Sequence, residues 1–187
     1  EKLSYLTFSG IDEKMTATIA EHFKTDYVRT ICNKDIYGVQ YAAVLKNIYA
    51  VGSGMAHGLD YGDNFLSVLI ANSADEMAGF LRKAGILNAE VGYIDHRKKS
   101  NPESHHNYAA SVYLGDLLVT CYSLFSRNRT FGNMIGKGYA VQAAQLEMSM
   151  VAEGYNASKC MYLINEQVDA DMPIANTIYK ILWEQLP

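Results

Sequence analysis

The stretch from Ile36 to Ala56 is apolar on nearly every side when it is placed on a helix, and it constrains the fold more than any other segment. A helix without a polar face lies in the middle of a domain. Lys46 and Asn47 stand at its centre, and a lysine at mid-span is costly in lipid, which argues against a membrane helix. We therefore expect a central helix around which a mainly α-helical domain packs.

Lys46 is the residue of this stretch that most needs an explanation, because lysine is almost never fully buried without a partner or a purpose. Burial favours the neutral amine, which suits a group that exchanges protons near neutral pH. Its helical neighbours are Ala42, Ala43, Tyr49 and Ala50, so small side chains would leave a hollow in front of the ammonium. The alternative is a lysine whose stem packs while its head reaches water.

Helical patterns continue from Asp35 to the end of the chain, separated by glycine, proline and polar residues. Asp35 and Asp63 can cap the first two helices, and Asp171 can cap the last one, with Pro173 in its first turn. The expected helices span about 35–57, 63–85, 108–122, 130–136, 140–148, 157–168 and 171–186, with a polar loop at 95–107.

The beginning of the chain follows a different pattern. Residues 3–8 and 27–32 are β-prone, and Asp12 can cap a helix between them. Strand, helix and strand form one βαβ unit, but two strands alone do not make a stable sheet. Together with the absence of an initiator Met, this predicts that residues 1–34 are the end of a larger α/β domain in a truncated chain.

Composition excludes several classes of protein. The net charge of −4 argues against binding to nucleic acid, although a local basic cluster can still hold a small phosphate. The odd number of cysteines, without a C-x-x-C pair, indicates reduced thiols in a cytoplasmic protein. The histidines at 96, 105 and 106 have no cysteine or acidic residue at a recognised ligand spacing, so we expect no metal site.

Two polar motifs can carry chemistry. Asp116 and Thr120 are four residues apart and share a helix face, so Asp116 could hold a buried ammonium, or it could simply cap its own helix after Gly115. The segment Ser126 to Arg129 precedes a helix expected near residue 130. Its guanidinium, amide and backbone N–H groups could cradle a phosphate, or it could be a solvated basic loop.

The glycines between Gly52 and Gly58 are a third motif, spaced G-x-G-x-x-x-G. They lie within the central helix and not after a strand, so they do not form a dinucleotide-binding loop. We interpret them as a site of close helix packing.

These motifs resemble, in wording and order, the family of NAD(P)-dependent glycerol-3-phosphate dehydrogenases over residues 35 to 187. The matching blocks are Gly38-Val39, Leu45 to Ala50, Gly58-Leu59, Gly62 to Asn64, Gly115 to Leu117, Val119 to Cys121, Ser126 to Gly132, Gly136 to Gly138, Val151 to Gly154 and Asp171 to Ala175. The resemblance implies an all-helical dehydrogenase C-terminal domain, similar to that of 6-phosphogluconate dehydrogenase, at 35–187. Residues 1–34 would then be the end of a Rossmann domain.

The resemblance also implies a reaction, the reversible hydride transfer between sn-glycerol 3-phosphate and NAD or NADP, which supplies glycerol 3-phosphate for phospholipid synthesis. Lys46 matches the family's general acid/base, and Asp116 matches the carboxylate that partners it. Asn47 and Thr120 match residues beside the substrate.

The phosphate and the cofactor have their own matching residues. Ser126, Arg127 and Asn128 match the phosphate-binding turn, and Arg127 can also approach the cofactor. Val151 and Glu153 match cofactor contacts that the helical domain makes.

The nucleotide fingerprint G-x-G-x-x-G after a first strand is absent from this sequence. We therefore expect the cofactor to be held mainly by a missing domain and this polypeptide alone to be a poor catalyst. The expected partners are a small phosphorylated substrate and a second copy in a homodimer, not nucleic acid or membrane. The alternatives are another two-domain dehydrogenase, such as a hydroxyacid dehydrogenase or ketopantoate reductase, and a non-catalytic helical interaction module.

Overall fold

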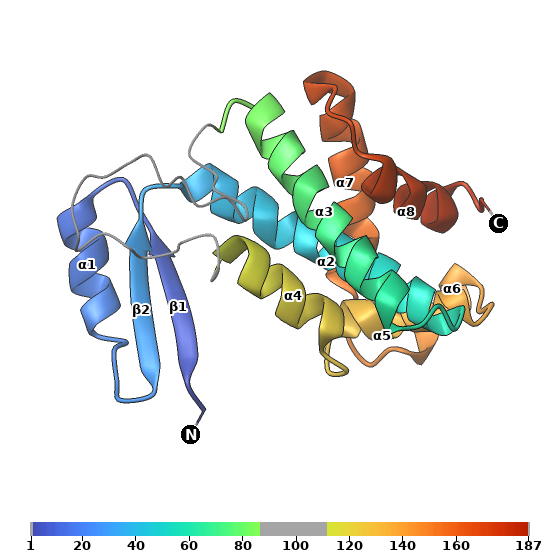
Figure 1. Ribbon diagram of the computed structural model, residues 1–187, viewed down its shortest axis with the longest axis horizontal. Coiled ribbons are helices and arrows are strands. Elements are labelled where there is room, and N and C mark those ends of the chain that lie inside the picture. Colours follow the sequence, from blue (N-terminus) through green and yellow to red (C-terminus); the bar gives the residue numbers. More distant parts are fainter. Residues whose placement is uncertain (1, 87–111, 187) are drawn as a thin grey trace.

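The computed structural model describes residues 2–86 and 112–186, so the polar segment at 95–107 lies outside the described residues. Strand β1 (Ser4–Ser9), helix α1 (Glu13–Glu21) and strand β2 (Val28–Asn33) form the expected βαβ unit. The two strands are parallel and pair from Ser4 with Val28 to Ser9 with Asn33. This unit lies at one end of the molecule, beside a larger helical part (Figure 1).

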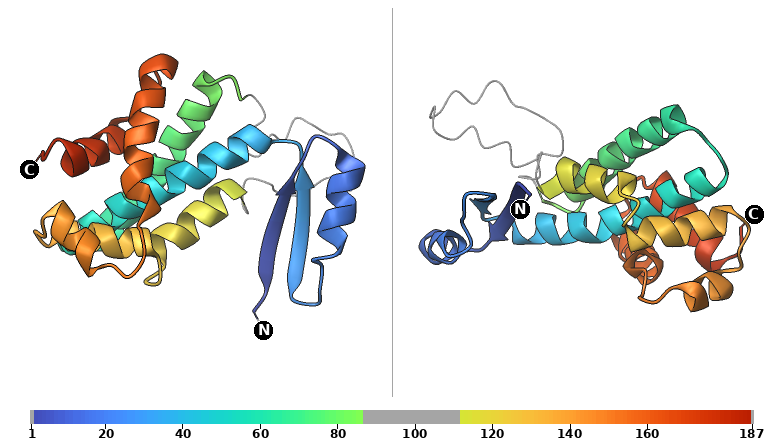
Figure 2. Two further views of the ribbon diagram at one scale, coloured as in Figure 1. Left: turned by 180° about the vertical axis from the view of Figure 1, so that it is seen from behind. Right: turned by 90° about the horizontal axis from the view of Figure 1, so that it is seen from below.

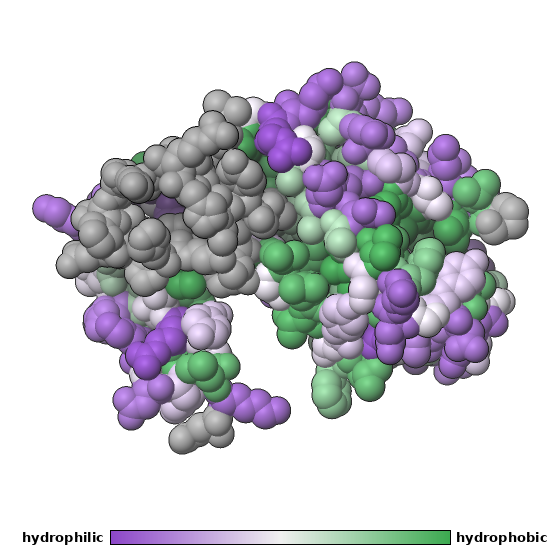
Figure 3. All heavy atoms as spheres, in the orientation of Figure 1, coloured by the Kyte–Doolittle hydropathy of each residue, from purple (hydrophilic) through white to green (hydrophobic). Residues whose placement is uncertain are grey.

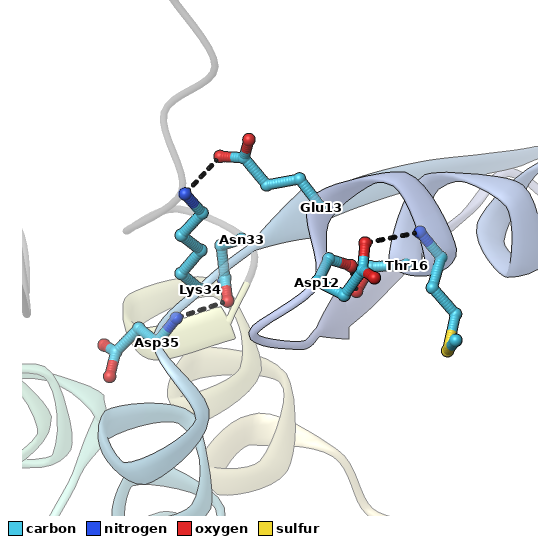
Figure 4. Close-up of polar contacts among 7 residues, drawn as sticks. Asp12, Glu13, Thr16, Asn33, Lys34 and Asp35 are labelled. Atoms are coloured by element: carbon cyan, nitrogen blue, oxygen red, sulfur yellow. Dashed lines mark hydrogen bonds and ion pairs between the residues drawn. The ribbon is translucent and has the colours of Figure 1, made fainter.

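Short-range polar contacts fix the βαβ unit and its exit. The Asp12 carboxylate accepts from the Met15 backbone N–H at 3.0 Å and caps α1 as expected. Lys34 Nζ lies 2.8 Å from the Glu13 carboxylate, so the residue after β2 is paired with the first turn of α1 (Figure 4). Only Lys34 and Asp35 connect β2 to the first helix of the helical part.

The helical part contains α2 (Ile36–Gly58), α3 (Asp63–Lys83), α4 (Leu114–Tyr122), α5 (Arg127–Gly136), α6 (Val141–Glu147), α7 (Glu153–Val168) and α8 (Pro173–Trp183). Helix α2 runs through its middle and contacts α3, α4, α5, α7 and α8 (Figures 1 and 2). Asp35 caps α2 by accepting from the Gly38 N–H at 2.8 Å, and it also accepts from the Tyr113 hydroxyl at the start of α4. The prediction of a central helix in a mainly α-helical fold is confirmed.

Several predicted boundaries were wrong. Helix α5 begins at Arg127 and α7 at Glu153, whereas we expected these helices to begin near residues 130 and 157. Asp63 and Asp171 are not caps, because the N-cap residues of α3 and α8 are Gly62 and Met172. Neither N-cap residue makes a side-chain hydrogen bond to its helix. Helix α4 begins at Leu114, and residues 108–111 of that prediction fall outside the described range. No helix in the described ranges is both long enough and apolar enough to cross a membrane.

Helices α2 and α5 approach backbone to backbone through glycines on both sides. A Cβ built on Gly132 of α5 would lie 1.9 Å from the Val51 carbonyl oxygen. On α2, a Cβ on Gly54 would lie 2.1 Å from the Arg129 carbonyl oxygen. Such distances are far inside van der Waals contact, so a side chain at either position would force the two backbones apart. The prediction that the glycines between Gly52 and Gly58 serve close helix packing is confirmed.

Glu76 of α3 explains why α8 needs no cap of its own. Its side chain is buried, and its carboxylate accepts from the backbone N–H groups of Ile174 and Ala175 at 2.7 and 2.9 Å. It also accepts from the Tyr49 hydroxyl of α2 at 3.1 Å. One carboxylate thus joins α2, α3 and the positive end of the α8 dipole.

Gly132→Ala should lower the free energy of unfolding by about 1–3 kcal/mol, because the new methyl group meets backbone that can move only with its whole helix. Gly79→Ala is the matched control: it is also within a helix, and a Cβ there meets nothing within 4 Å. That change should stabilise the protein by about 0.5–1 kcal/mol, since alanine has less backbone freedom to lose. Denaturant unfolding of both variants checks this, and similar effects would contradict the close approach of α2 and α5.

Glu76→Ala should lower the free energy of unfolding by roughly 2–4 kcal/mol, because it leaves three donors without their acceptor. Burial, assisted by the nearby Asp171, raises the pKa of Glu76 despite these hydrogen bonds. Its contribution to stability is therefore full below the ordinary carboxyl pKa and declines as the pH rises through the raised value. As the pH rises through that range, the wild type should therefore lose stability relative to Glu76→Gln, whose amide does not titrate. A stability difference independent of pH would contradict this.

Candidate functional site

Lys46 of α2 forms an ion pair with Asp116 in the first turn of α4. The lysine side chain is 20% exposed and the aspartate side chain 40%, so the pair lies at the edge of the core. Thr120, one turn further along α4, donates its hydroxyl to the Asp116 carbonyl at 2.6 Å. The alternative that Asp116 merely caps α4 is wrong, because Tyr113 occupies the N-cap position and the Asp116 carboxylate contacts Lys46.

The surroundings of Lys46 differ from the hollow lined by small residues that the sequence suggested. Ala42 and Ala50 are buried, but Ala43 is exposed. Tyr49 is buried and directs its hydroxyl to Glu76. The ammonium therefore neither extends freely into water nor lies in a closed cavity; it is held against a carboxylate at an open face.

The start of α5 brings three of the predicted site residues together. Ser126 is the N-cap, and its hydroxyl accepts from the Arg129 N–H at 3.3 Å. Because the helix begins at Arg127 and not near residue 130, Arg127 and Asn128 belong to its first turn. Their side chains therefore lie beside the free backbone N–H groups at the positive end of the helix dipole. This combination suits the binding of an anion.

Arg129 belongs to the segment that the sequence suggested as a phosphate cradle, but no role of its own was predicted for it. It is 8% exposed, and its Nη1 donates to the Tyr122 carbonyl at 3.2 Å. Its Nε has no hydrogen-bond partner, and no carboxylate within the described residues pairs with it. Burial raises the pKa of Cys121 to about 11, although the charge of Arg129 acts in the opposite direction. The start of α5 therefore rests on a buried positive charge, which a polar motif on its own could not reveal.

The start of α7 connects the other predicted residues. Asn47 donates its Nδ2 to a Glu153 carboxylate oxygen at 3.1 Å, and Arg127 Nη2 lies 4.0 Å from the other oxygen of that carboxylate. The Asn128 side chain accepts from the Gly154 N–H at 2.8 Å. Polar groups from α2, α5 and α7 thus meet at the start of α7, and Asn47 directly follows Lys46 along α2.

Val151 lies just before α7 and is 67% exposed. Beside it is a hollow of about 230 Å³ between α5, α6 and α7, with Phe131 and Tyr155 among its lining residues. Arg127 Nη1 lies 3.8 Å from Met150 Sδ in the same loop. The exposed Val151 side chain, the Glu153 carboxylate and the Arg127 guanidinium could together contact part of a nucleotide. The carboxylate can accept from ribose hydroxyls, and the guanidinium can donate to phosphates. No group of potential metal ligands occurs among residues 2–86 and 112–186.

Comparisons with known proteins identify the family of this chain. The profile of the family described as NAD-dependent glycerol-3-phosphate dehydrogenase C-terminus matches residues 35–187. A glycerol-3-phosphate dehydrogenase [NAD(P)+] from Staphylococcus haemolyticus is 36% identical over 179 residues, covering 96% of this chain and 49% of that protein. The corresponding protein from Lacticaseibacillus paracasei is 33% identical over 99% of this chain and 48% of its own length.

A solved structure shows the same fold. The crystal structure of glycerol-3-phosphate dehydrogenase from Coxiella burnetii matches with a TM-score of 0.81 and 25% identity, over 96% of this chain and 50% of that one. The fold and the site thus define a helical dehydrogenase domain. The chain belongs to the family of C-terminal domains of NAD-dependent glycerol-3-phosphate dehydrogenases, and it spans about half the length of the curated relatives it matches. This membership disfavours the other two-domain dehydrogenases and the non-catalytic module.

Proposed function

We propose that this chain is the substrate-binding half of an NAD(P)-dependent glycerol-3-phosphate dehydrogenase, which interconverts sn-glycerol 3-phosphate and dihydroxyacetone phosphate. One observation carries the proposal: the paired Lys46 and Asp116 adjoin a network that leads through Asn47 and Glu153 to Arg127 at the start of α5. A proton-exchanging group and an anion-binding helix start are the two elements that a phosphorylated hydroxy substrate requires.

The two parts of the chain support a division at the β2–α2 connection. We assign residues 1–34 to the end of a Rossmann cofactor domain and residues 35–187 to the helical domain, and the family profile also begins at residue 35. Leu124 and Phe125, after α4, are 74% and 97% exposed, and apolar side chains gather on α4 and the turn that follows it (Figure 3). Such a surface suits cover by a further domain, so we expect the chain alone to be inactive.

Lys46 is the proposed general acid/base. In the reducing direction its ammonium donates a proton to the C2 oxygen of dihydroxyacetone phosphate, and in the oxidising direction its amine takes that proton back. Asp116 holds the ammonium in place through their ion pair. A bound nicotinamide nucleotide supplies or accepts the hydride. Asn47 and Thr120, which neighbour Lys46 and Asp116, are the proposed contacts to the reacting part of the substrate.

The phosphate of the substrate is proposed to bind at the start of α5. Ser126, Arg127 and Asn128 offer a hydroxyl, a guanidinium and an amide there, above the buried charge of Arg129. Arg127 can donate to a phosphate oxygen once its weak contact with Glu153 at 4.0 Å is exchanged.

The cofactor NAD or NADP is proposed to contact this chain through Arg127, Val151 and Glu153. Their exposure on the face of the hollow supports this assignment.

Cys32, Cys121 and Cys160 are all free thiols, which supports a reducing compartment such as the cytoplasm. A homodimer is a further proposal, since helices with exposed apolar positions often pair.

Arg127→Ala in the full-length protein should raise KM for dihydroxyacetone phosphate by roughly ten- to a hundred-fold, because each charge-assisted hydrogen bond contributes about 1.5–3 kcal/mol. Activity on unphosphorylated dihydroxyacetone should change much less, since that substrate has no charge to lose. Arg82→Ala, which removes an exposed arginine from the end of α3, is the control for net charge. Steady-state kinetics on both substrates decide the matter: equal losses would assign Arg127 to the cofactor or the fold, and an inactive wild-type protein would refute the proposed function.

A further inference from the structure

Asn128 has a structural partner outside its own helix. Its side chain is 8% exposed, and its Oδ1 accepts from the Gly154 N–H at 2.8 Å. The N-cap residue of α7, Ala152, has no side-chain oxygen to offer, so α7 begins without a local cap. Asn128 supplies that cap from α5, because its oxygen satisfies one of the free N–H groups in the first turn of α7.

The start of α7 is held from a second side by α2. A Cβ on Gly154 would lie 2.5 Å from the Asn47 carbonyl oxygen, so the two backbones are in direct contact. Glu153, the preceding residue, accepts from the Asn47 side chain. The first turn of α7 is therefore clamped between α2 and the Asn128 side chain, and Glu153 and Val151 take their positions from that turn.

The cap also determines which way the Asn128 amide faces. A backbone N–H can only donate, so the atom of Asn128 that faces Gly154 must be the oxygen. The NH₂ group is then not directed at that N–H, and it donates to no other group among the described residues. The orientation that caps α7 is thus the one that leaves two donors for an anion at the start of α5.

We propose that Asn128 is a positioning residue for the cofactor contacts at the start of α7, in addition to its proposed role in holding the substrate phosphate. The inference rests on the proposed function, which assigns Val151 and Glu153 to the cofactor. One amide then serves both sites: its oxygen holds α7, and its nitrogen faces the phosphate. Because coupling between two sites is reciprocal, a bound phosphate that fixes the amide also fixes the cofactor contacts, and a bound cofactor favours the phosphate.

The test compares Asn128→Ala, which removes both halves of the amide, with Asn128→Asp, which keeps an oxygen acceptor for Gly154 but loses the donors. The readout is the Kd of NADH and of NADPH for the full-length protein, measured without any phosphorylated substrate. Asn128→Ala should weaken binding of the preferred cofactor roughly three- to tenfold, the equivalent of one lost cap. Asn128→Asp should remain within about twofold of the wild type, although both variants raise KM for dihydroxyacetone phosphate.

A double-mutant cycle with Glu153→Gln tests the route. If Asn128 acts by positioning Glu153, Asn128→Ala should add little to the loss of cofactor affinity that Glu153→Gln already causes. A wild-type Kd in Asn128→Ala, equal losses in Asn128→Ala and Asn128→Asp, or full additivity with Glu153→Gln would each overturn the inference. These outcomes differ from failure of the proposed function, in which the wild-type protein itself neither binds NADH or NADPH nor reduces dihydroxyacetone phosphate.

Discussion

The close approach of three helix backbones is the constraint on which the rest of the structure depends. Helix α2 meets α5 at Gly54 and Gly132, and it meets α7 at Gly154, in each case with a carbonyl oxygen where a side chain would otherwise be. Because no side chains separate these backbones, van der Waals contact between main-chain atoms sets how closely the helices approach. The start of α5 and the start of α7 therefore hold constant positions relative to Lys46 on α2, and those two starts carry the proposed contacts to the phosphate and to the cofactor.

At the starts of α7 and α8, a side chain from a neighbouring helix takes the place of a local cap. Glu76 satisfies the first turn of α8, and Asn128 satisfies that of α7. An ordinary cap stabilises one helix, whereas these two side chains also tie that helix to another one. The loss of either would leave buried donors unsatisfied, so we expect the helical part to resist changes in the relative positions of its helices.

The sequence predicted those features that depend on nearest neighbours along the chain. Asp12 and Asp35 cap the helices that follow them, and the apolar run around Lys46 is the central helix. Asp171 was the wrong cap because the start of α8 is satisfied by Glu76, a residue nearly a hundred positions away. No local pattern distinguishes such a buried glutamate from the solvated one that its charge suggests, and the same is true of the buried Arg129.

The candidate site shows the same limit. Spacing alone placed Asp116 and Thr120 on one helix face and left open whether Asp116 holds an ammonium or caps its helix. The family resemblance assigned Asp116 to Lys46, because a contact between two helices is not encoded in either helix. The glycines between Gly52 and Gly58 were more informative, since their position within an apolar helix has few explanations besides close packing.

Lys46, paired with Asp116, is the group that we propose exchanges the proton of the reaction. The most direct measurement is kcat for dihydroxyacetone phosphate reduction by full-length Lys46→Ala, with Lys137→Ala, an exposed lysine at the end of α5, as the control. We expect a kcat about 10²–10⁴ times lower for Lys46→Ala, at an unchanged unfolding temperature, and a normal kcat for the control. A folded Lys46→Ala protein that turns over at nearly the wild-type rate would contradict it.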